Sequence, residues 1–258
     1  LLAQKAIVRA FKRIRSKPDV LYAHFWHSGV VAGVISRRYK IPFFVASGES
    51  KIWVKDLYKD STIYENLEDV NGVICVSKKN MEESIELGLA DKGKMIVIPN
   101  AINSNYFYPI NRETARKKLG YKEDDFIVAF TGSFDHRKGV LRLSRAIQKI
   151  RNVKAIYIGS GDLTPKGDGI LFVGRLPHDQ IVYYLNAADI FVLPTLAEGC
   201  CNAIIEAMAC GLPIISSNLS FNDDILNNRN SIRVDSNNID QIADAIQYLK
   251  DNHKVRNN

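Results

Sequence analysis

The stretch that most constrains this chain is residues 197–213, because its pattern predicts one complete strand–loop–helix–strand unit. The apolar run at 190–194 predicts a buried strand that ends at a proline, and the run at 213–216 predicts the next strand. Gly211 stands where a glycine commonly ends a helix. Such units are the building blocks of parallel α/β sheets.

Two glutamates lie in this unit, Glu198 in the loop and Glu206 within the helix. The unpaired N–H groups and the dipole at a helix start attract an anion such as a phosphate. Two carboxylates beside an anion site are unusual unless they bind hydroxyl groups or a developing positive charge. A phosphorylated sugar offers both features.

Length and composition indicate a globular chain with room for two domains. The chain has 258 residues, of which 46% are hydrophobic and 24% charged. None of the four cysteines is paired at metal-ligand spacing, which predicts reduced thiols in a cytoplasmic protein. No stretch has the pattern of a signal peptide or of a membrane-spanning helix.

The net charge is +7, and basic residues crowd the first segment. They are Lys5, Arg9, Lys12, Arg13, Arg15 and Lys17. They form either a solvated helix face or a surface that meets anionic lipid head groups or an anionic substrate. No aromatic residues interleave them as in nucleic-acid-binding surfaces, so we expect no nucleic-acid partner.

Strands and helices are expected to alternate, which predicts an α/β fold with two Rossmann-like, doubly wound parallel-sheet domains. Strands are expected at 20–25, 43–46, 73–76, 95–98, 126–131, 155–158, 170–173, 190–194, 213–216 and 231–234. Helices are expected at 1–15, 28–39, 78–87, 112–119, 140–150, 179–188 and 239–249, and before Cys210. Residues 53–66 show no clean period. The domains are expected at 1–103 and 104–258, the first thin for its fold.

Four loops follow strands of the second half, where open parallel sheets bind ligands. In the first loop, Gly132 allows close backbone approach, while Arg137 and Lys138 supply cations for a diphosphate or are simply solvated. The second loop contains Gly159 and Gly161, which also suit an ordinary tight turn. The third contains Arg175 and Leu176, whose backbone could border a nucleotide base, and the fourth is the opening stretch.

In the first half, His24 and His27 close a strand at its ligand-facing end. Either histidine could assist catalysis or bind a hydroxyl group, or could serve the structure alone. The acidic pairs at 124–125 and 223–224 lack a set of partner ligands, so no metal site is predicted.

The chain resembles the retaining glycosyltransferases of the GT-B fold, specifically their large fourth family. Residues 198–213 match the family pattern Glu-Gly-x-x-Asn-x-x-x-Glu-Ala-Met-Ala-Cys-Gly-x-Pro, with its two glutamates. Residues 97–102 and 107–109 resemble its linker signature, with Ala101 where glycine is usual, and residues 137–139 resemble its diphosphate-binding loop.

The resemblance implies that Glu206 binds the ribose hydroxyls of a nucleotide-sugar donor and that Glu198 lies beside the transferred sugar. The residues expected to bind the donor are Gly132, Arg137, Lys138, Gly159, Gly161, Arg175, Leu176, Glu198, Gly199, Cys200, Cys201, Asn202 and Glu206. Those expected on the acceptor side are His24, His27 and Ser47, and the expected catalytic residues are Glu198 and His27.

The chain departs from the family pattern at several places. Ser133 stands where many relatives carry an arginine, and Ser47 where many carry a histidine. The family's first strands and its closing helix are not recognisable, so an N-terminally incomplete chain with a truncated first domain is expected.

The expected activity is transfer of a hexose-type sugar from a UDP-, GDP- or ADP-sugar to a saccharide or lipid-linked saccharide, with retention and without a metal or cofactor. Surface polysaccharide or glycolipid synthesis is the expected setting, with peripheral contact to the inner face of the plasma membrane. A non-catalytic sugar-nucleotide-binding module and a GT-B phosphorylase or sucrose-type synthase are the alternatives.

Overall fold

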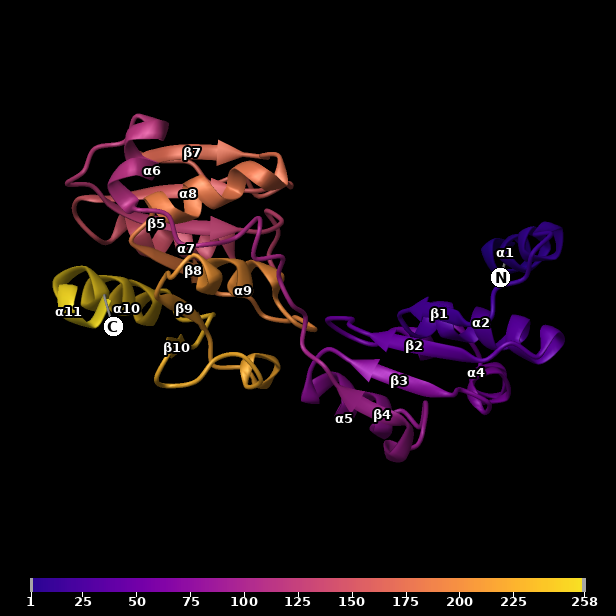
Figure 1. The fold of residues 1–258 in the computed structure, drawn as a ribbon. Helices are drawn as coiled ribbons and strands as arrows, with labels where there is room; N and C mark the ends of the chain where they lie inside the picture. Colours follow the sequence, from indigo (N-terminus) through magenta and orange to yellow (C-terminus); the bar gives the residue numbers. More distant parts are fainter. Residues whose placement is uncertain (1, 257–258) are drawn as a thin grey trace. The chain divides into compact units, whose positions relative to one another are not determined.

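The computed structural model describes residues 2–256, which form two compact units (Figure 1). The first unit is built from the chain up to Asn100 together with Glu198–Cys200. The second is built from Ala101–Ala197 and the chain from Cys201 onward. Each unit contains one parallel sheet covered by helices, so the predicted α/β fold with two parallel sheets is confirmed.

The sheet of the first unit has four parallel strands in the order β1-β2-β3-β4. Its strands are β1 (Leu21–His24), β2 (Phe43–Ser47), β3 (Gly72–Cys75) and β4 (Met95–Val97). Its helices are α1 (Leu2–Arg13), α2 (Trp26–Tyr39), α3 (Val54–Leu57), α4 (Asp60–Leu67), α5 (Lys78–Glu86) and the 3-10 turn η1 (Lys92–Lys94). Strand order follows chain order, because each crossover places the next strand on the same side.

Small residues let helix α2 pack closely in this unit, as the glycines of this segment suggest. A Cβ on Gly33 would lie 1.8 Å from the carbonyl oxygen of Asn66, so the α2 backbone lies directly against the end of α4. The stretch at 53–66, which shows no clean period, contains the short helices α3 and α4. Helix α3 is a single turn, and the buried face of α4 consists of Ile63, Asn66 and Leu67, so a polar residue interrupts its apolar pattern.

The second unit contains a six-stranded parallel sheet in the order β10-β9-β8-β5-β6-β7. Its strands are β5 (Phe126–Thr131), β6 (Val153–Ile158), β7 (Ile170–Gly174), β8 (Ile190–Leu193), β9 (Ile214–Ser217) and β10 (Ser231–Val234). Its helices are α6 (Arg112–Leu119), α7 (Val140–Gln148), α8 (Ile181–Ala187), α9 (Asn202–Ala209), α10 (Ile239–Asp251) and α11 (His253–Arg256), with 3-10 turns η2 (His178–Gln180) and η3 (Ser220–Asn222). The bounds of the elements expected from the sequence differ from these by at most two residues.

The strand order of this sheet reverses beside its first strand. From β5 the chain runs outward through β6 and β7, and then returns to add β8 on the other side of β5. Strands β5, β8 and β9 are almost completely buried, as their continuous apolar runs predict. The loops that follow β5 and β8 therefore diverge at the sheet's topological switch point, which is where open α/β sheets bind ligands.

Candidate functional site

Three loops are hydrogen-bonded in series along the carboxyl ends of β5, β6 and β7. The Gly132 N–H donates to the carbonyl oxygen of Ile158 at 3.0 Å, and the Gly159 N–H donates to that of Gly174 at 2.8 Å. The Phe134 N–H donates to the carbonyl oxygen of Ser160 at 2.8 Å. The structure thus brings together the loops that were expected to meet at this edge.

Close packing of the backbone is enough to explain why glycine occupies two positions in these loops. Gly159 has φ of 149°, and a Cβ there would lie 1.8 Å from the carbonyl oxygen of Gly132. A Cβ on Gly161 would lie 2.5 Å from the carbonyl oxygen of Phe134. Each glycine allows two backbones to touch, so its contribution to ligand binding stays a prediction.

Arg137 joins the loops on the two sides of the switch point. Its Nη1 donates to the carbonyl oxygen of Ala197 at 2.7 Å, and the Leu196 N–H donates to the carbonyl oxygen of Arg137 at 2.9 Å. Gly139 lies at the same junction with φ of 79°, where a Cβ would lie 2.5 Å from the carbonyl oxygen of Pro194. Arg137 is half-buried. Its guanidinium therefore both carries positive charge and links the loops that follow β5 and β8.

Asp135 shapes the turn that carries Arg137 and Lys138. Its carboxylate accepts hydrogen bonds from the Lys138 N–H at 2.7 Å and from the Ser133 hydroxyl at 2.5 Å. Burial by itself raises the pKa of Asp135, but these two hydrogen bonds and the charges of Arg137 and Lys138 together outweigh burial and lower it. Ser133 stands where relatives often carry an arginine, and its hydroxyl stabilises this turn through the bond to Asp135. The sequence pattern did not single out Asp135.

Glu206 lies in α9 beside His178, which begins η2 after strand β7. Its Oε1 is 3.2 Å from His178 Nε2, and its side chain is only 12% exposed. Burial raises the pKa of the Glu206 carboxyl, and the contacts with His178 oppose that effect. The His178 ring also packs edge-on against Phe107, with 5.0 Å between centroids. His178 was missed, although its place just after a strand of the ligand-binding edge was a usable signal.

The loop between β8 and α9 carries the remaining expected donor residues. Glu198 is 7% exposed and Cys201 is 3% exposed, while Cys200 is half-buried and Asn202 is exposed at the start of α9. Gly199 is buried. Their donor-binding roles, and the catalytic role of Glu198, stay predictions.

In the loop after β7, Arg175 and Leu176 differ in their surroundings. Arg175 is exposed, whereas Leu176 packs against the apolar core of the second unit. The Leu176 side chain thus serves packing, and the roles of both residues toward a ligand stay predictions.

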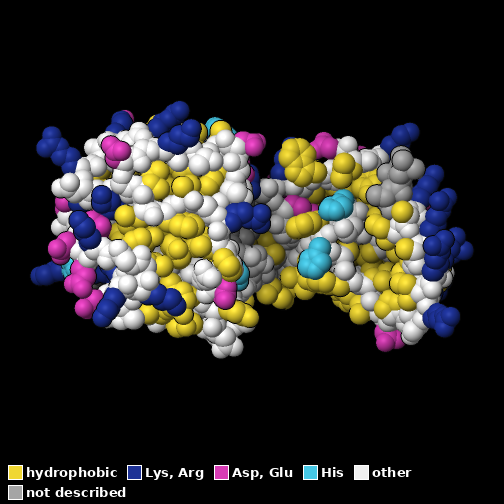
Figure 2. Space-filling model, turned by 90° about the horizontal axis from the view of Figure 1, so that it is seen from above, with side chains coloured by type: hydrophobic (Ala, Val, Ile, Leu, Met, Phe, Trp, Pro, Cys, Tyr) yellow, Lys and Arg dark blue, Asp and Glu magenta, His cyan; other side chains and the backbone are white. Residues whose placement is uncertain are grey.

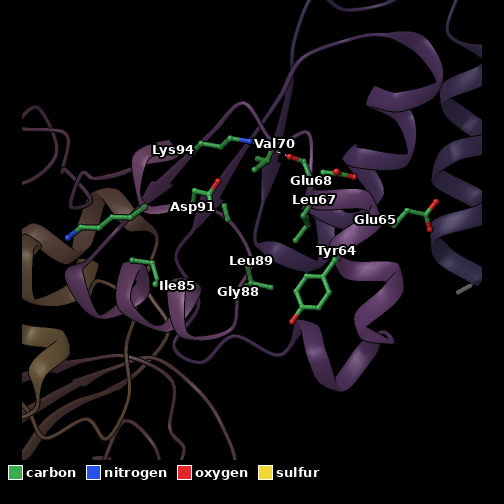
Figure 3. A pocket seen from close by; sticks show the side chains of 12 residues that line it. Tyr64, Glu65, Leu67, Glu68, Val70, Ile85, Gly88, Leu89, Asp91 and Lys94 are labelled. Carbon is green, nitrogen blue, oxygen red and sulfur yellow. Dashed lines mark hydrogen bonds between the residues drawn. The ribbon is translucent and has the colours of Figure 1, made fainter.

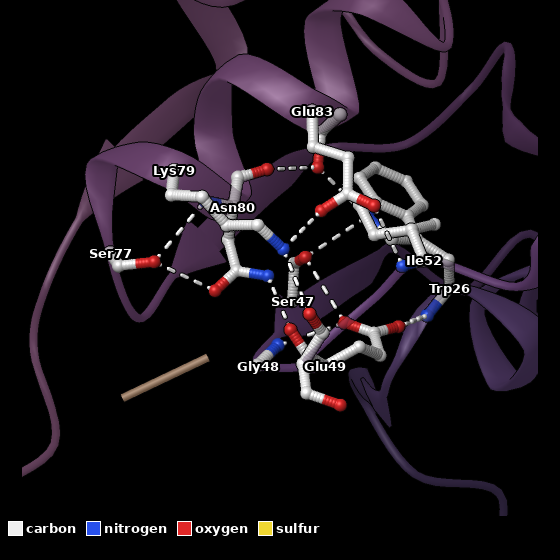
Figure 4. Close-up of polar contacts among 11 residues, drawn as sticks. Trp26, Ser47, Gly48, Glu49, Ile52, Ser77, Lys79, Asn80 and Glu83 are labelled. Atoms are coloured by element: carbon white, nitrogen blue, oxygen red, sulfur yellow. Dashed lines mark hydrogen bonds and ion pairs between the residues drawn. The ribbon is translucent and has the colours of Figure 1, made fainter. Parts of the chain in front are cut away.

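In the first unit, the expected acceptor-side residues lie at the carboxyl ends of β1 and β2. His24 and His27 are both exposed. Ser47 is completely buried, and its hydroxyl accepts from Trp26 Nε1 at 3.1 Å and donates to Glu49 Oε2 at 3.1 Å (Figure 4). Any effect of Ser47 on a ligand therefore passes through Trp26 or Glu49.

A cavity of about 630 Å³ lies at the opposite end of the strands of this sheet, beside the amino ends of β3 and β4 (Figure 3). Its lining includes Tyr64, whose hydroxyl donates to the carbonyl oxygen of Leu87 at 3.5 Å, and Lys94, whose Nζ donates to that of Glu68 at 3.3 Å. Open parallel sheets bind ligands at the carboxyl ends of their strands. This cavity is therefore not the expected site.

Comparison with known families identifies both parts of the chain. The family model described as glycosyl transferases group 1 matches residues 111–258, and the model described as glycosyltransferase family 4 matches residues 1–106. The first match alone covers more than half of the chain.

Individual relatives agree with these matches. The chain is 29% identical over 252 residues to TuaC of Bacillus subtilis (strain 168), a glycosyltransferase named for teichuronic acid biosynthesis. That match covers 93% of this chain and 64% of TuaC, so the chain spans less than two thirds of that relative. It is 27% identical over 281 residues to the UDP-Gal:alpha-D-GlcNAc-diphosphoundecaprenol alpha-1,3-galactosyltransferase of Escherichia coli, covering 98% of this chain and 72% of that enzyme.

Solved structures share the fold. Sucrose-phosphate synthase from Thermosynechococcus elongatus superposes with a TM-score of 0.82 at 22% identity, covering 99% of this chain and 69% of that one. HepE of Anabaena, in complex with UDP, superposes with a TM-score of 0.81 at 18% identity, covering 99% and 74%. The chain belongs to the glycosyl transferases group 1, a family of retaining glycosyltransferases with the GT-B fold that use nucleotide sugars.

Proposed function

We propose that this chain transfers a hexose-type sugar from a nucleoside diphosphate sugar to a saccharide or lipid-linked saccharide, with retention of anomeric configuration. The observation that carries the proposal is the link between Arg137 and Ala197, which joins the loops on both sides of the switch point. A donor diphosphate bound there would meet the charges of Arg137 and Lys138.

In this proposal the diphosphate becomes a better leaving group because these two cations stabilise the charge that develops on it. Glu206 accepts hydrogen bonds from the ribose hydroxyls, and His178, 3.2 Å from its Oε1, helps to orient the carboxylate. Glu198 lies by the transferred sugar, and the backbone N–H groups of residues 199–202 contact sugar and phosphate. The leaving phosphate takes the acceptor's proton as the acceptor attacks from the same face.

The named relatives support a UDP-sugar as donor and a lipid-linked saccharide as acceptor. The Escherichia coli relative is named for UDP-Gal and for a diphosphoundecaprenol-linked sugar, and HepE has been solved with UDP-glucose. We therefore place UDP-sugars before GDP- and ADP-sugars, and surface polysaccharide or glycolipid synthesis as the setting.

Helix α1 supports peripheral contact with the cytoplasmic face of an anionic membrane. Lys and Arg side chains gather along one side of the first unit (Figure 2), and Lys5, Arg9 and Lys12 of α1 are exposed. Ile7 and Ile14 are 51% and 47% exposed, so the same segment also presents apolar side chains to solvent. No helix within the described residues 2–256 is long and apolar enough to cross a membrane.

Calorimetric titration with UDP-glucose tests the donor site. Glu206→Ala and Lys138→Ala should each weaken binding about tenfold or more, since each removes a charge-assisted contact. Glu113→Ala and Lys149→Ala alter exposed residues of the same unit and should leave binding unchanged. Unchanged affinity in both site variants, with melting curves showing folded protein, would rule out the assignment.

A product assay separates the proposed activity from its alternatives. With UDP-glucose and a saccharide acceptor, sugar transfer or slow donor hydrolysis supports the transferase, and a protein that binds the donor but does neither is a non-catalytic module. Release of sugar phosphate on addition of inorganic phosphate would identify a phosphorylase.

A further inference from the structure

Phe25, between strand β1 and helix α2, has a backbone conformation that is foreign to phenylalanine. Its φ is 71° and its ψ is 154°, a region that glycine adopts freely and bulky residues almost never do. The other described non-glycine residues with positive φ are Lys40 and Asn152. Lys40 caps a helix in the ordinary left-handed conformation. Phe25 is therefore the outlier among them.

Four hydrogen bonds hold this conformation. The Phe25 N–H donates to the carbonyl oxygen of Ala46 at 2.8 Å, and the Phe25 carbonyl oxygen accepts from the N–H groups of Ser28 and Gly29 at 3.1 and 3.0 Å. On the far side of the peptide, the Trp26 N–H donates to Glu49 Oε1 at 2.7 Å (Figure 4). That last bond holds the peptide group that defines the ψ angle of Phe25.

Glu49 is itself fixed from several directions. Its Oε2 accepts from the Gly48 N–H at 2.9 Å and from the Ser47 hydroxyl at 3.1 Å. Its carbonyl oxygen accepts from Asn80 Nδ2 at 2.8 Å, which ties it to helix α5. The carboxylate thus connects the end of β2 with the start of α2 and over-determines the strained peptide.

Burial of the neighbouring tryptophan does not explain an aromatic residue at position 25. Trp26 is completely buried, but a glycine at position 25 would allow the same chain path without strain. The Phe25 side chain does not enter the core, because it is 39% exposed. The strain therefore keeps an aromatic ring at the surface.

The surroundings of the ring suit a sugar. The His27 ring lies 6.0 Å away at an angle of 33°, and a Cβ on Gly48 would lie 3.7 Å from a carbon of the Phe25 ring. An aromatic face next to an imidazole offers an apolar platform with a hydrogen-bonding group at its side. A pyranose presents C–H groups on one face and hydroxyl groups around its rim, which matches this pair.

We propose that Phe25 is a saccharide-stacking residue of the acceptor site, and that Glu49 is the positioning residue that holds it there. The inference rests on the proposed transferase function and adds two residues that carry part of its acceptor recognition. Ser47, through its bond to Glu49, acts in the same assembly.

Saturation-transfer NMR titrations with methyl α-glucopyranoside, methyl α-galactopyranoside and N-acetylglucosamine test the proposal. At least one of them should bind the intact protein, and Phe25→Gly should weaken that binding about tenfold, the upper range of a ring contact. The melting temperature of Phe25→Gly should stay equal or rise, because glycine relieves the strain. Absence of binding to the intact protein, or equal binding by Phe25→Gly, overturns the proposal.

Glu49→Gln tests the positioning role. Gln keeps the size but cannot accept from both the Gly48 and Trp26 N–H groups in the same way, so sugar binding should weaken. Combined with Phe25→Gly it should cause no further loss, because Glu49 acts through the ring, and additive losses would refute that role. Tyr64→Ala, which removes another exposed aromatic ring of this unit, should not change sugar binding.

Glu206→Ala separates this proposal from the donor site. It should lose nucleotide binding and keep saccharide binding, so failure of one site leaves the test of the other intact.

Discussion

Arg137 donates a hydrogen bond from Nη1 to the carbonyl oxygen of Ala197 across 2.7 Å, and so connects the loop after β5 with the loop after β8. In the sequence, 60 positions separate the two residues. The connection gives one cation two tasks, because the same guanidinium fixes the loop geometry and contributes positive charge.

Replacement of Arg137 by lysine should separate these tasks. Lysine keeps the charge but lacks the planar fork, so it cannot reproduce the bond to Ala197 with the same head position. We expect Arg137→Lys to weaken UDP binding about tenfold, the effect of losing one charge-assisted hydrogen bond, and Arg137→Ala to weaken it further.

Calorimetric titration with UDP measures this effect, and Arg145→Lys on the exposed side of α7 serves as the control. If Arg137→Lys binds UDP as the unchanged protein does, charge alone matters and the loop connection has no role in binding.

The pH dependence of nucleotide binding should reflect Glu206. Burial raises the pKa of its carboxyl in the folded protein, so the proton returns to it at a higher pH than to an ordinary glutamate. In the proposed donor site, the ionised carboxylate accepts hydrogen bonds from the ribose hydroxyl groups more strongly than the protonated form does. Affinity for UDP should therefore begin to fall at mildly acidic pH, and Glu206→Gln should bind weakly with no such decline.

The raised pKa of Glu206 also affects stability, but stability should fall as pH rises, whereas nucleotide affinity should fall as pH decreases. Since the folded pKa is above the unfolded one, the folded state holds more protons in the window between them, and the free energy of unfolding decreases as pH rises through that window. Urea unfolding at several pH values measures this. A Glu206→Gln variant that shows the same slope would exclude Glu206 as its source.

Gly159→Ala should destabilise the second unit strongly. The new Cβ would lie 1.8 Å from the backbone of Gly132, which cannot move without breaking the hydrogen bond to Ile158. With the additional penalty of φ at 149°, we expect a loss of about 3 kcal/mol or more in the free energy of unfolding.

Gly120→Ala is the matched control, because Gly120 has φ of 72° and no atom within 4 Å of its Cβ position. It should cost about 1 kcal/mol, the price of the left-handed conformation alone. Equal losses for the two variants in urea unfolding would show that the close approach of the two loops is not rigid.

Much of the fold follows from local pattern. The continuous apolar runs of β5, β8 and β9 predict buried parallel strands, and Gly211 follows the end of helix α9 as expected. Helices α3 and α4 were not predicted, because α3 is a single turn and the buried face of α4 includes the polar Asn66, so neither shows a clear apolar period.

The candidate site likewise has a part that local sequence motifs predict and a part that depends on tertiary contacts. The spacing of Glu198 and Glu206 and the pair Arg137–Lys138 are local motifs, so the sequence alone determined to which family the chain belongs and predicted which loops carry the site. The sequence did not pair these residues with their partners, because Ala197 is distant in the chain from Arg137 and His178 is distant from Glu206; the position of His178 just after a strand was the one usable signal. Only the tertiary structure decided that Arg137 ties two loops, that His178 meets Glu206, and that Glu49 holds the strained Phe25, since such contacts depend on the packing of strands that are distant in the chain.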